Sequence, residues 1–104
     1  MIVEMRTYDL KPGAIPEYMK LYEAHGLSVQ REALGKMIGY FSSEIGQLNQ
    51  VVHLWCYDDF QDRQRRRDKL MQNETWQKYL AMVTPLVVNQ VSQILKPASF
   101  SPRY

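Results

Sequence analysis

The alternation of apolar and polar residues at the start of the chain predicts a β-strand over residues 2–10. Its period of two fits a strand whose two faces meet different surroundings. One face carries Val3 and Met5, and the other carries Glu4, Arg6 and Tyr8. Apolar residues then recur at helical spacing between residues 15 and 29, which predicts a long first helix. Gly26 lies within that apolar stripe, where it either allows close packing of the helix on the sheet or marks a break.

Two further strands are predicted over residues 37–45 and 51–57, joined by a hairpin loop at residues 46–49. Asp58 and Asp59 are suited to cap the helix that follows. The helical pattern is interrupted at Asn73 and resumes at Trp76, so we expect a second helical region that is kinked or split in two. Residues 87–95 are rich in β-branched side chains and predict a fourth strand.

The predicted order of elements is β-α-β-β-α-β, which defines the fold class as α+β. A four-stranded antiparallel sheet with both helices on one face accommodates this order without crossed connections, as in the ferredoxin-like fold. The chain of 104 residues is long enough for one hydrophobic core. We therefore expect one domain over residues 1–97 and a C-terminal tail over residues 98–104.

Both faces of the predicted sheet carry apolar residues, although the helices can cover only one. The face expected to pack against the helices carries Val3, Met5, Met37, Phe41, Val52, Leu54 and Cys56. The opposite face carries Ile2, Ile38, Tyr40, Val51, Trp55 and Tyr57, together with Glu4, Arg6, Ser42, Glu44 and His53. At roughly 25 cal/mol per Å² of apolar surface, leaving that second face in water costs several kcal/mol. A second copy of the chain can cover it by two-fold symmetry, which predicts a homodimer through the sheet faces.

The space between two such sheets is predicted to hold a small, partly apolar molecule, because aromatic walls with few polar groups are typical of ligand pockets. The expected lining is Glu4, Arg6, Tyr8, Tyr40, Ser42, His53, Trp55 and Tyr57. His53 is the first catalytic candidate, since an imidazole exchanges protons near neutral pH, and the alternative is a structural hydrogen bond in the interface. Arg6 either binds a carboxylate or carbonyl, with Tyr8 as proton donor, or forms an ion pair with Glu4 that fixes the sheet register.

Composition and charge exclude several partners. The 13 Lys and Arg against 11 Asp and Glu give a net charge of +2, too small to favour nucleic acid or anionic lipid. The basic run at residues 62–69 is spread around its helix, where Asp62 and Arg66 are spaced to pair. Two histidines without a cysteine or carboxylate cluster predict no metal site and no cofactor. With one cysteine, no long apolar run and no signal-peptide pattern, we expect a cytoplasmic protein that does not contact membranes.

Several short motifs together resemble the NIPSNAP family over nearly the whole chain. They are Glu4-Met5-Arg6-Thr7-Tyr8, Pro12-Gly13, Gly39-Tyr40-Phe41, the block from Gly46 to Tyr57, Arg63 to Arg67, and Trp76. The resemblance implies a dimeric α+β barrel. The wider superfamily includes cofactor-free monooxygenases, haem-degrading enzymes and small-molecule sensing domains, and small bacterial NIPSNAP members mostly have no assigned activity.

Three hypotheses for the function follow. The first is a binding role for a small molecule. The second is a cofactor-independent monooxygenase or isomerase, in which His53 abstracts a proton and Arg6 or Tyr57 stabilises the enolate. The third is a structural assembly module whose own side chains fill the pocket.

Overall fold

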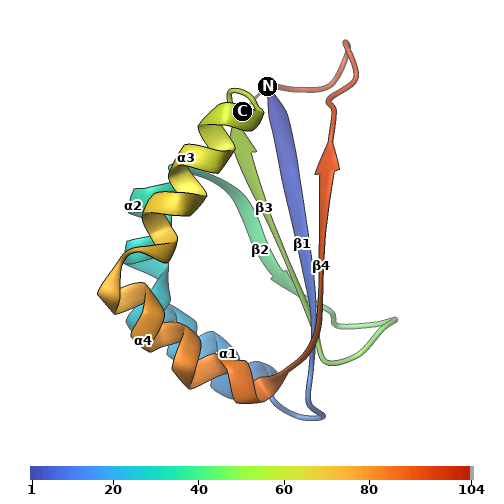
Figure 1. The fold of residues 1–104 in the computed structure, drawn as a ribbon. Helices are drawn as coiled ribbons and strands as arrows, with labels where there is room; N and C mark the ends of the chain where they lie inside the picture. The colour runs from blue at the N-terminus through green and yellow to red at the C-terminus, as the bar shows by residue number, and fades with distance from the viewer. Residues whose placement is uncertain (104) are drawn as a thin grey trace.

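The computed structural model describes residues 1–103 and confirms the predicted ferredoxin-like α+β fold (Figure 1). The strands are β1 (Ile2–Leu10), β2 (Lys36–Ser42), β3 (Gln50–Tyr57) and β4 (Val87–Leu95). The helices are α1 (Ile15–Leu21), α2 (Leu27–Leu34), α3 (Phe60–Met71) and α4 (Glu74–Val83). The strands form one antiparallel sheet in the order β2-β3-β1-β4, and all four helices lie on one side of it.

Both helical regions are interrupted, and each break has a local cause. Tyr22–Gly26 forms a π-helical turn between α1 and α2, and a Cβ atom at Gly26 would lie 3.1 Å from ring atoms of both Tyr22 and Tyr79. Gly26 thus marks the break and also permits close packing, against a residue of α4 instead of the sheet. Between α3 and α4, the side chain of Asn73 accepts a hydrogen bond of 3.0 Å from the backbone N–H of Trp76 and starts the new helix.

The helices cover the opposite sheet face from the one predicted, and this face assignment was wrong. His53, Trp55 and Tyr57 are at most 2% exposed beneath the helices, whereas Val52, Leu54 and Cys56 alternate with them on the open face. The physical reason is that an aromatic ring buries a large area when its polar tip has a partner. The helices, the neighbouring strands and β3 itself supply such partners, so the face with more polar atoms became the core.

A β-bulge in β2 explains why one strand follows the prediction at one end and reverses it at the other. Met37 pairs with Trp55 and Gly39 pairs with the next residue of β3, Leu54, so Ile38 is an extra residue. Met37 therefore faces the helices and Ile38 the open side, as predicted. Beyond the bulge Tyr40 faces the helices, and Phe41 is 56% exposed on the open side, the reverse of the prediction.

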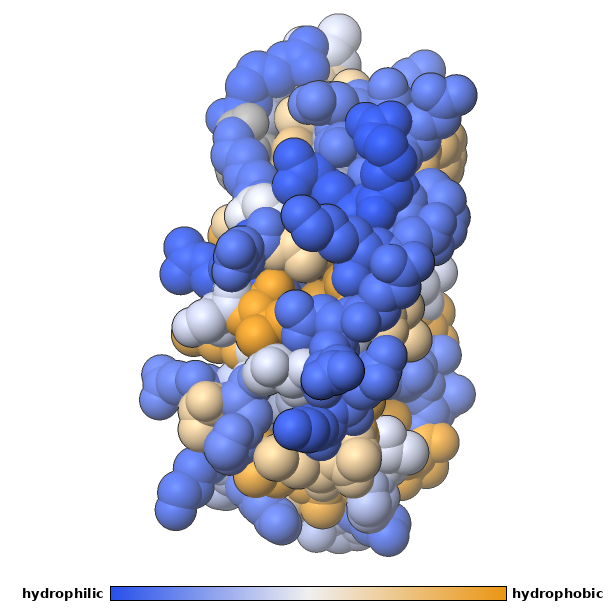
Figure 2. Space-filling model, turned by 60° about the vertical axis from the view of Figure 1, so that its left-hand side comes forward, coloured by the Kyte–Doolittle hydropathy of each residue, from blue (hydrophilic) through white to orange (hydrophobic). Residues whose placement is uncertain are grey.

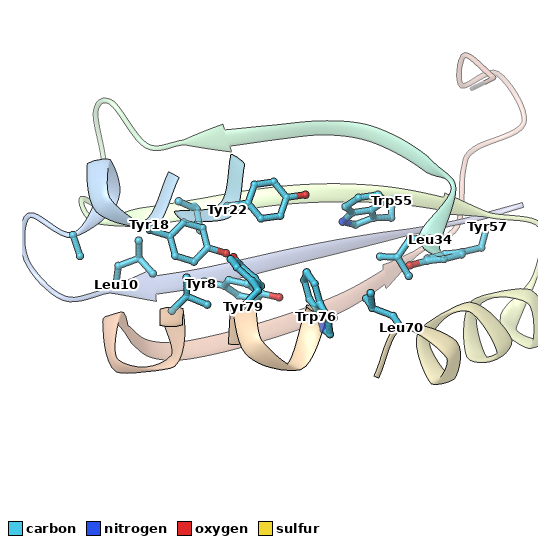
Figure 3. Packing of buried hydrophobic residues seen from close by; sticks show 13 residues of the cluster. Tyr8, Leu10, Tyr18, Tyr22, Leu34, Trp55, Tyr57, Leu70, Trp76 and Tyr79 are labelled. Carbon is cyan, nitrogen blue, oxygen red and sulfur yellow. The ribbon is translucent and has the colours of Figure 1, made fainter. Parts of the chain in front are cut away.

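The core consists largely of tyrosine and tryptophan side chains that the sheet and helices direct toward one another (Figure 3). Tyr8 and Trp55 come from the sheet, and Tyr18, Trp76 and Tyr79 come from the helices. The outer surface of the helical layer is mostly hydrophilic (Figure 2). As predicted, Arg66 donates to Asp62 on α3, at 2.9 Å, although Asp62 is buried.

Candidate functional site

A cavity of about 400 Å³ lies between the sheet and the helices of a single chain. Its lining consists of Tyr8, Tyr18, Tyr22, Gln30, Tyr40, His53, Trp76, Tyr79, Leu80, Val83, Thr84, Val87, Val88, Asn89 and Gln90. The last of these residues, Thr84 and Val88 to Gln90, are exposed, so the cavity opens between the end of α4 and the start of β4. The predicted lining therefore does not face a second sheet: Tyr8, Tyr40 and His53 face the helices of their own chain, because the two sheet faces are reversed.

The structure brings together part of the predicted site. Tyr8, Tyr40 and His53 line the cavity, and Trp55 and Tyr57 lie in the core along the same sheet face. Glu4 and Arg6 of β1 lie on that same sheet face. Ser42 lies at the exposed end of β2 and does not line the cavity.

The helical wall was missed by the sequence analysis, which treated its residues only as an apolar stripe. Tyr18 and Tyr22 project from the first helical region, and Trp76 and Tyr79 from α4. Hydroxyl groups spaced four residues apart on a buried stripe were the available signal, because a buried phenol requires a polar partner. The partners here are Tyr40 for Tyr18, with 2.7 Å between the two oxygens, and Gln30 for Tyr22, at 2.6 Å.

His53 is held as a neutral hydrogen-bond donor. The indole Nε1–H of Trp55 donates to His53 Nδ1 at 2.7 Å, and an indole nitrogen only donates, so the imidazole proton resides on Nε2. The imidazole ring stacks on Tyr40 with 4.4 Å between ring centroids. Burial, together with the positive charges of Arg6 and Arg67, lowers the pKa of His53 from 6.5 to about 3. His53 Nε2 is buried and has no hydrogen-bond partner among residues 1–103.

Glu4 forms the centre of a buried ionic network. Its carboxylate accepts hydrogen bonds from Arg63 at 2.8 and 3.1 Å, from Arg6 at 3.1 Å and from the hydroxyl of Ser92. Burial alone would raise the pKa of Glu4, but the bonds from Arg63 and Ser92 and the charges of both arginines lower it to about 2. The predicted Glu4–Arg6 ion pair is present. The contribution of Arg63 was not predicted, because it lies 59 residues further along the chain.

Tyr57 and Tyr8 hold different positions relative to this network. The Tyr57 hydroxyl donates to Glu4 at 3.5 Å, and burial together with the charge of Glu4 raises the pKa of Tyr57 to about 12. Its hydroxyl therefore serves the network and not the cavity. The Tyr8 hydroxyl accepts a bond of 2.7 Å from Arg6 Nε, and Tyr8 also lines the cavity. Tyr8 thus connects the arginine cluster with the cavity wall.

Residues 1–103 contain neither a candidate metal-binding cluster nor a candidate membrane-spanning helix. No group of three or more His, Cys, Asp or Glu side chains in this range is placed to hold a metal ion. None of the helices described is long and apolar enough to span a bilayer.

Comparison with known proteins gives matches over almost the whole chain. The NIPSNAP family model matches residues 3–102. Protein NipSnap of Drosophila melanogaster is 34% identical over 97% of this chain and 36% of its own length. The chain thus spans about a third of that relative.

Solved structures match more closely. An uncharacterized NIPSNAP-like domain protein from Burkholderia xenovorans is 48% identical, with a TM-score of 0.95 over 98% of this chain and 89% of that one. A NIPSNAP family protein with unknown function from Agrobacterium tumefaciens is 44% identical, with a TM-score of 0.96 over 98% and 92% of the two chains. An antibiotic biosynthesis monooxygenase shares the fold, with a TM-score of 0.66 over 94% and 99% of the two chains, at only 14% identity.

Proposed function

The chain belongs to the NIPSNAP family, and on this premise we propose that it binds a small planar molecule in the cavity between its own sheet and helices. The observation that carries the proposal is a cavity of about 400 Å³ whose wall includes the buried, unpartnered donor of His53. Natural ligand pockets have this size and this combination of aromatic walls with few polar groups. A module filled by its own side chains would have no such volume.

The enzymatic alternative is supported by the fold shared with an antibiotic biosynthesis monooxygenase, at an identity that carries no activity across. Proton abstraction by His53 is not favoured by the geometry. Its Nε2 already holds a proton, and its pKa of about 3 makes it a weak base. The residues that line the cavity, all within the described range, include no carboxylate to replace it. Binding is therefore the preferred function.

A pair of tryptophan variants on α4 tests the binding role. Leu80 lines the cavity and is half-buried, whereas Met82 is 40% exposed and does not line it. Titration calorimetry with 2-naphthoate and with neutral 2-naphthamide should detect binding of at least one probe to the native chain. Leu80→Trp should weaken this binding by narrowing the cavity, and Met82→Trp should leave it unchanged. Binding of neither probe, or equal binding by Leu80→Trp, would contradict the proposed function.

The homodimer is also a proposal, now through the open face of the sheet. That face presents Phe41 and Val91, which are 56% and 53% exposed, beside the half-buried Val52 and Leu54. Its centre carries no charged side chain, which suits a self-complementary contact with a second copy. The dimeric barrel implied by the family resemblance supports the same arrangement. A cytoplasmic location stays a prediction.

A further inference from the structure

Resting on the proposed function, we propose that the cavity selects a planar aromatic carboxylate whose oxygens accept hydrogen bonds from His53 Nε2–H and the Tyr8 hydroxyl. The proposal deepens the binding role by naming the chemical class of the ligand. Three features of the described residues support it: the direction of the hydrogen bonds, the balance of charge and the shape of the walls.

The buried side-chain atoms at the cavity that have no hydrogen-bond partner among residues 1–103 are both donors. His53 Nε2–H is buried without an acceptor, and its direction is set by the bond from Trp55 to the other ring nitrogen. Trp76, which also lines the cavity, has a buried indole N–H without a partner. A buried donor costs about 1–3 kcal/mol when its bond is not made. An acceptor-rich ligand removes that cost, whereas a ligand bearing only donors does not.

Tyr8 provides a second donor next to His53. Its ring meets the imidazole edge to face, with 5.0 Å between the centroids. Because the Tyr8 oxygen accepts from Arg6 Nε at 2.7 Å, its own proton points away from the guanidinium and is available to another acceptor. The bond from a cation also polarises the hydroxyl, which strengthens its bond to an anion. A carboxylate has two oxygens and can accept from donors on two neighbouring side chains.

The charged side chains next to Tyr8 and His53 carry a net positive charge. Arg6, Arg63 and Arg67 face the single carboxylate of Glu4, so three positive charges and one negative leave a local charge of +2. Arg67 Nη1 is buried and has no partner among residues 1–103. Burial, and then the charge of Arg6, lowers the pKa of Arg67, which identifies an uncompensated cation in the same layer. A bound carboxylate supplies the missing negative charge.

The remaining walls fit a flat apolar body. Tyr40 stacks on the imidazole, and Trp76 and Tyr79 lie with their ring centroids 4.9 Å apart on the helical side. The Tyr40 ring is already packed between His53 and Tyr22, with 4.4 and 4.5 Å between centroids. The ring surface open to a ligand therefore comes mainly from Trp76 and Tyr79. Leu80 and Val83 complete the apolar lining. A fused two-ring acid places its carboxylate at the donor end and its rings between these side chains.

The probes that distinguish this inference from general binding are 2-naphthoate and 2-naphthamide, which have nearly the same shape but differ in charge. Titration calorimetry of the native chain at pH 7 should show at least about tenfold tighter binding of 2-naphthoate, since a hydrogen bond to a charged group contributes about 1.5–3 kcal/mol. Equal affinities within twofold would overturn the inference while leaving the binding role intact. Failure of both probes would instead contradict the binding role.

Two substitutions at His53 separate its donor from its bond to Trp55. The side-chain oxygen of His53→Asn reaches the position of Nδ1 and keeps an acceptor for Trp55, but leaves no donor at the ε position. His53→Gln places an amide N–H near the ε position. The preference for 2-naphthoate should fall about tenfold in His53→Asn and persist in His53→Gln. If His53→Asn weakens both probes equally, the role of His53 is structural and the inference fails.

Variants outside the imidazole keep the inference testable if His53→Asn does not fold. Tyr8→Phe removes the second donor and should reduce the preference for 2-naphthoate several-fold. Arg67→Gln removes the buried cation and should do the same, whereas Arg65→Gln, whose side chain is 69% exposed on the same helix, should not. A preference that is unchanged in both Tyr8→Phe and Arg67→Gln would overturn the inference.

Discussion

Acidification from pH 7 to pH 5 should destabilise this protein mainly through His53. The unfolded chain binds a proton at His53 near pH 6.5, whereas the folded chain does so only near pH 3, because burial and the charges of Arg6 and Arg67 oppose it. Below pH 6.5 the unfolded state therefore holds more protons, and stability falls with pH until the folded pKa is reached. Between pH 7 and pH 5 the expected loss is about 2 kcal/mol.

Urea unfolding followed by far-ultraviolet circular dichroism at pH 7, 6 and 5 measures this loss. With a slope of about 1–2 kcal/mol per M, the urea midpoint should fall by about 1–2 M. His53→Asn should remove most of the pH dependence in this window, whatever its stability at pH 7. All samples need one protein concentration, since assembly of copies would also shift the midpoint.

His25 provides the matched control, because it is the only other histidine and its side chain is exposed on the π-helical turn. His25→Asn should retain the native pH dependence. The reasoning fails if the native chain loses less than about 0.5 kcal/mol between pH 7 and pH 5. It also fails if His25→Asn, instead of His53→Asn, flattens the profile.

Three further predictions concern the network, the open face and a turn. Glu4→Gln should lower the free energy of unfolding at pH 7 by about 3 kcal/mol, because it removes the carboxylate whose interactions hold the pKa of Glu4 at about 2 instead of 4.5 and leaves the arginines beside it unpaired. Urea titration checks this, with Glu44→Gln at an exposed position as the control. Val91→Asp should shift a dimer to monomers in light scattering, and an unchanged mass would contradict the proposed interface. Gly35→Ala should lower the thermal midpoint by the equivalent of about 1–2 kcal/mol, because Gly35 has φ +85° and a Cβ there would lie 2.8 Å from Arg66; an unchanged midpoint would refute this.

The order and type of the elements followed from periodicity, whereas the choice of sheet face did not. Alternation in β3 is regular, but both of its sides are apolar by composition, so the pattern alone does not show which side the helices cover. The outcome depended on tertiary hydrogen bonds, such as that between Tyr18 and Tyr40 and that from Tyr57 to Glu4. An inward face that carries Trp, Tyr and His is stable only when those polar atoms find partners, and this information lies in the packing.

The sequence therefore predicted several residues of the candidate site, but not which layer of the fold they face. Tyr8, Tyr40 and His53 were selected because they share one face, and they still share it when that face turns toward the helices. Contacts between distant segments escaped the prediction. Arg63 reaches Glu4 across 59 residues, and Tyr79 approaches Gly26 closely, but no local spacing encodes either contact.

The most direct test of the account is a crystal structure of the chain with 2-naphthoate. We expect the rings to lie against Trp76 and Leu80 inside one chain, with a carboxylate oxygen within hydrogen-bond distance of His53 Nε2. A ligand held between the sheets of two copies, or a carboxylate directed away from His53 toward the mouth at β4, would contradict it.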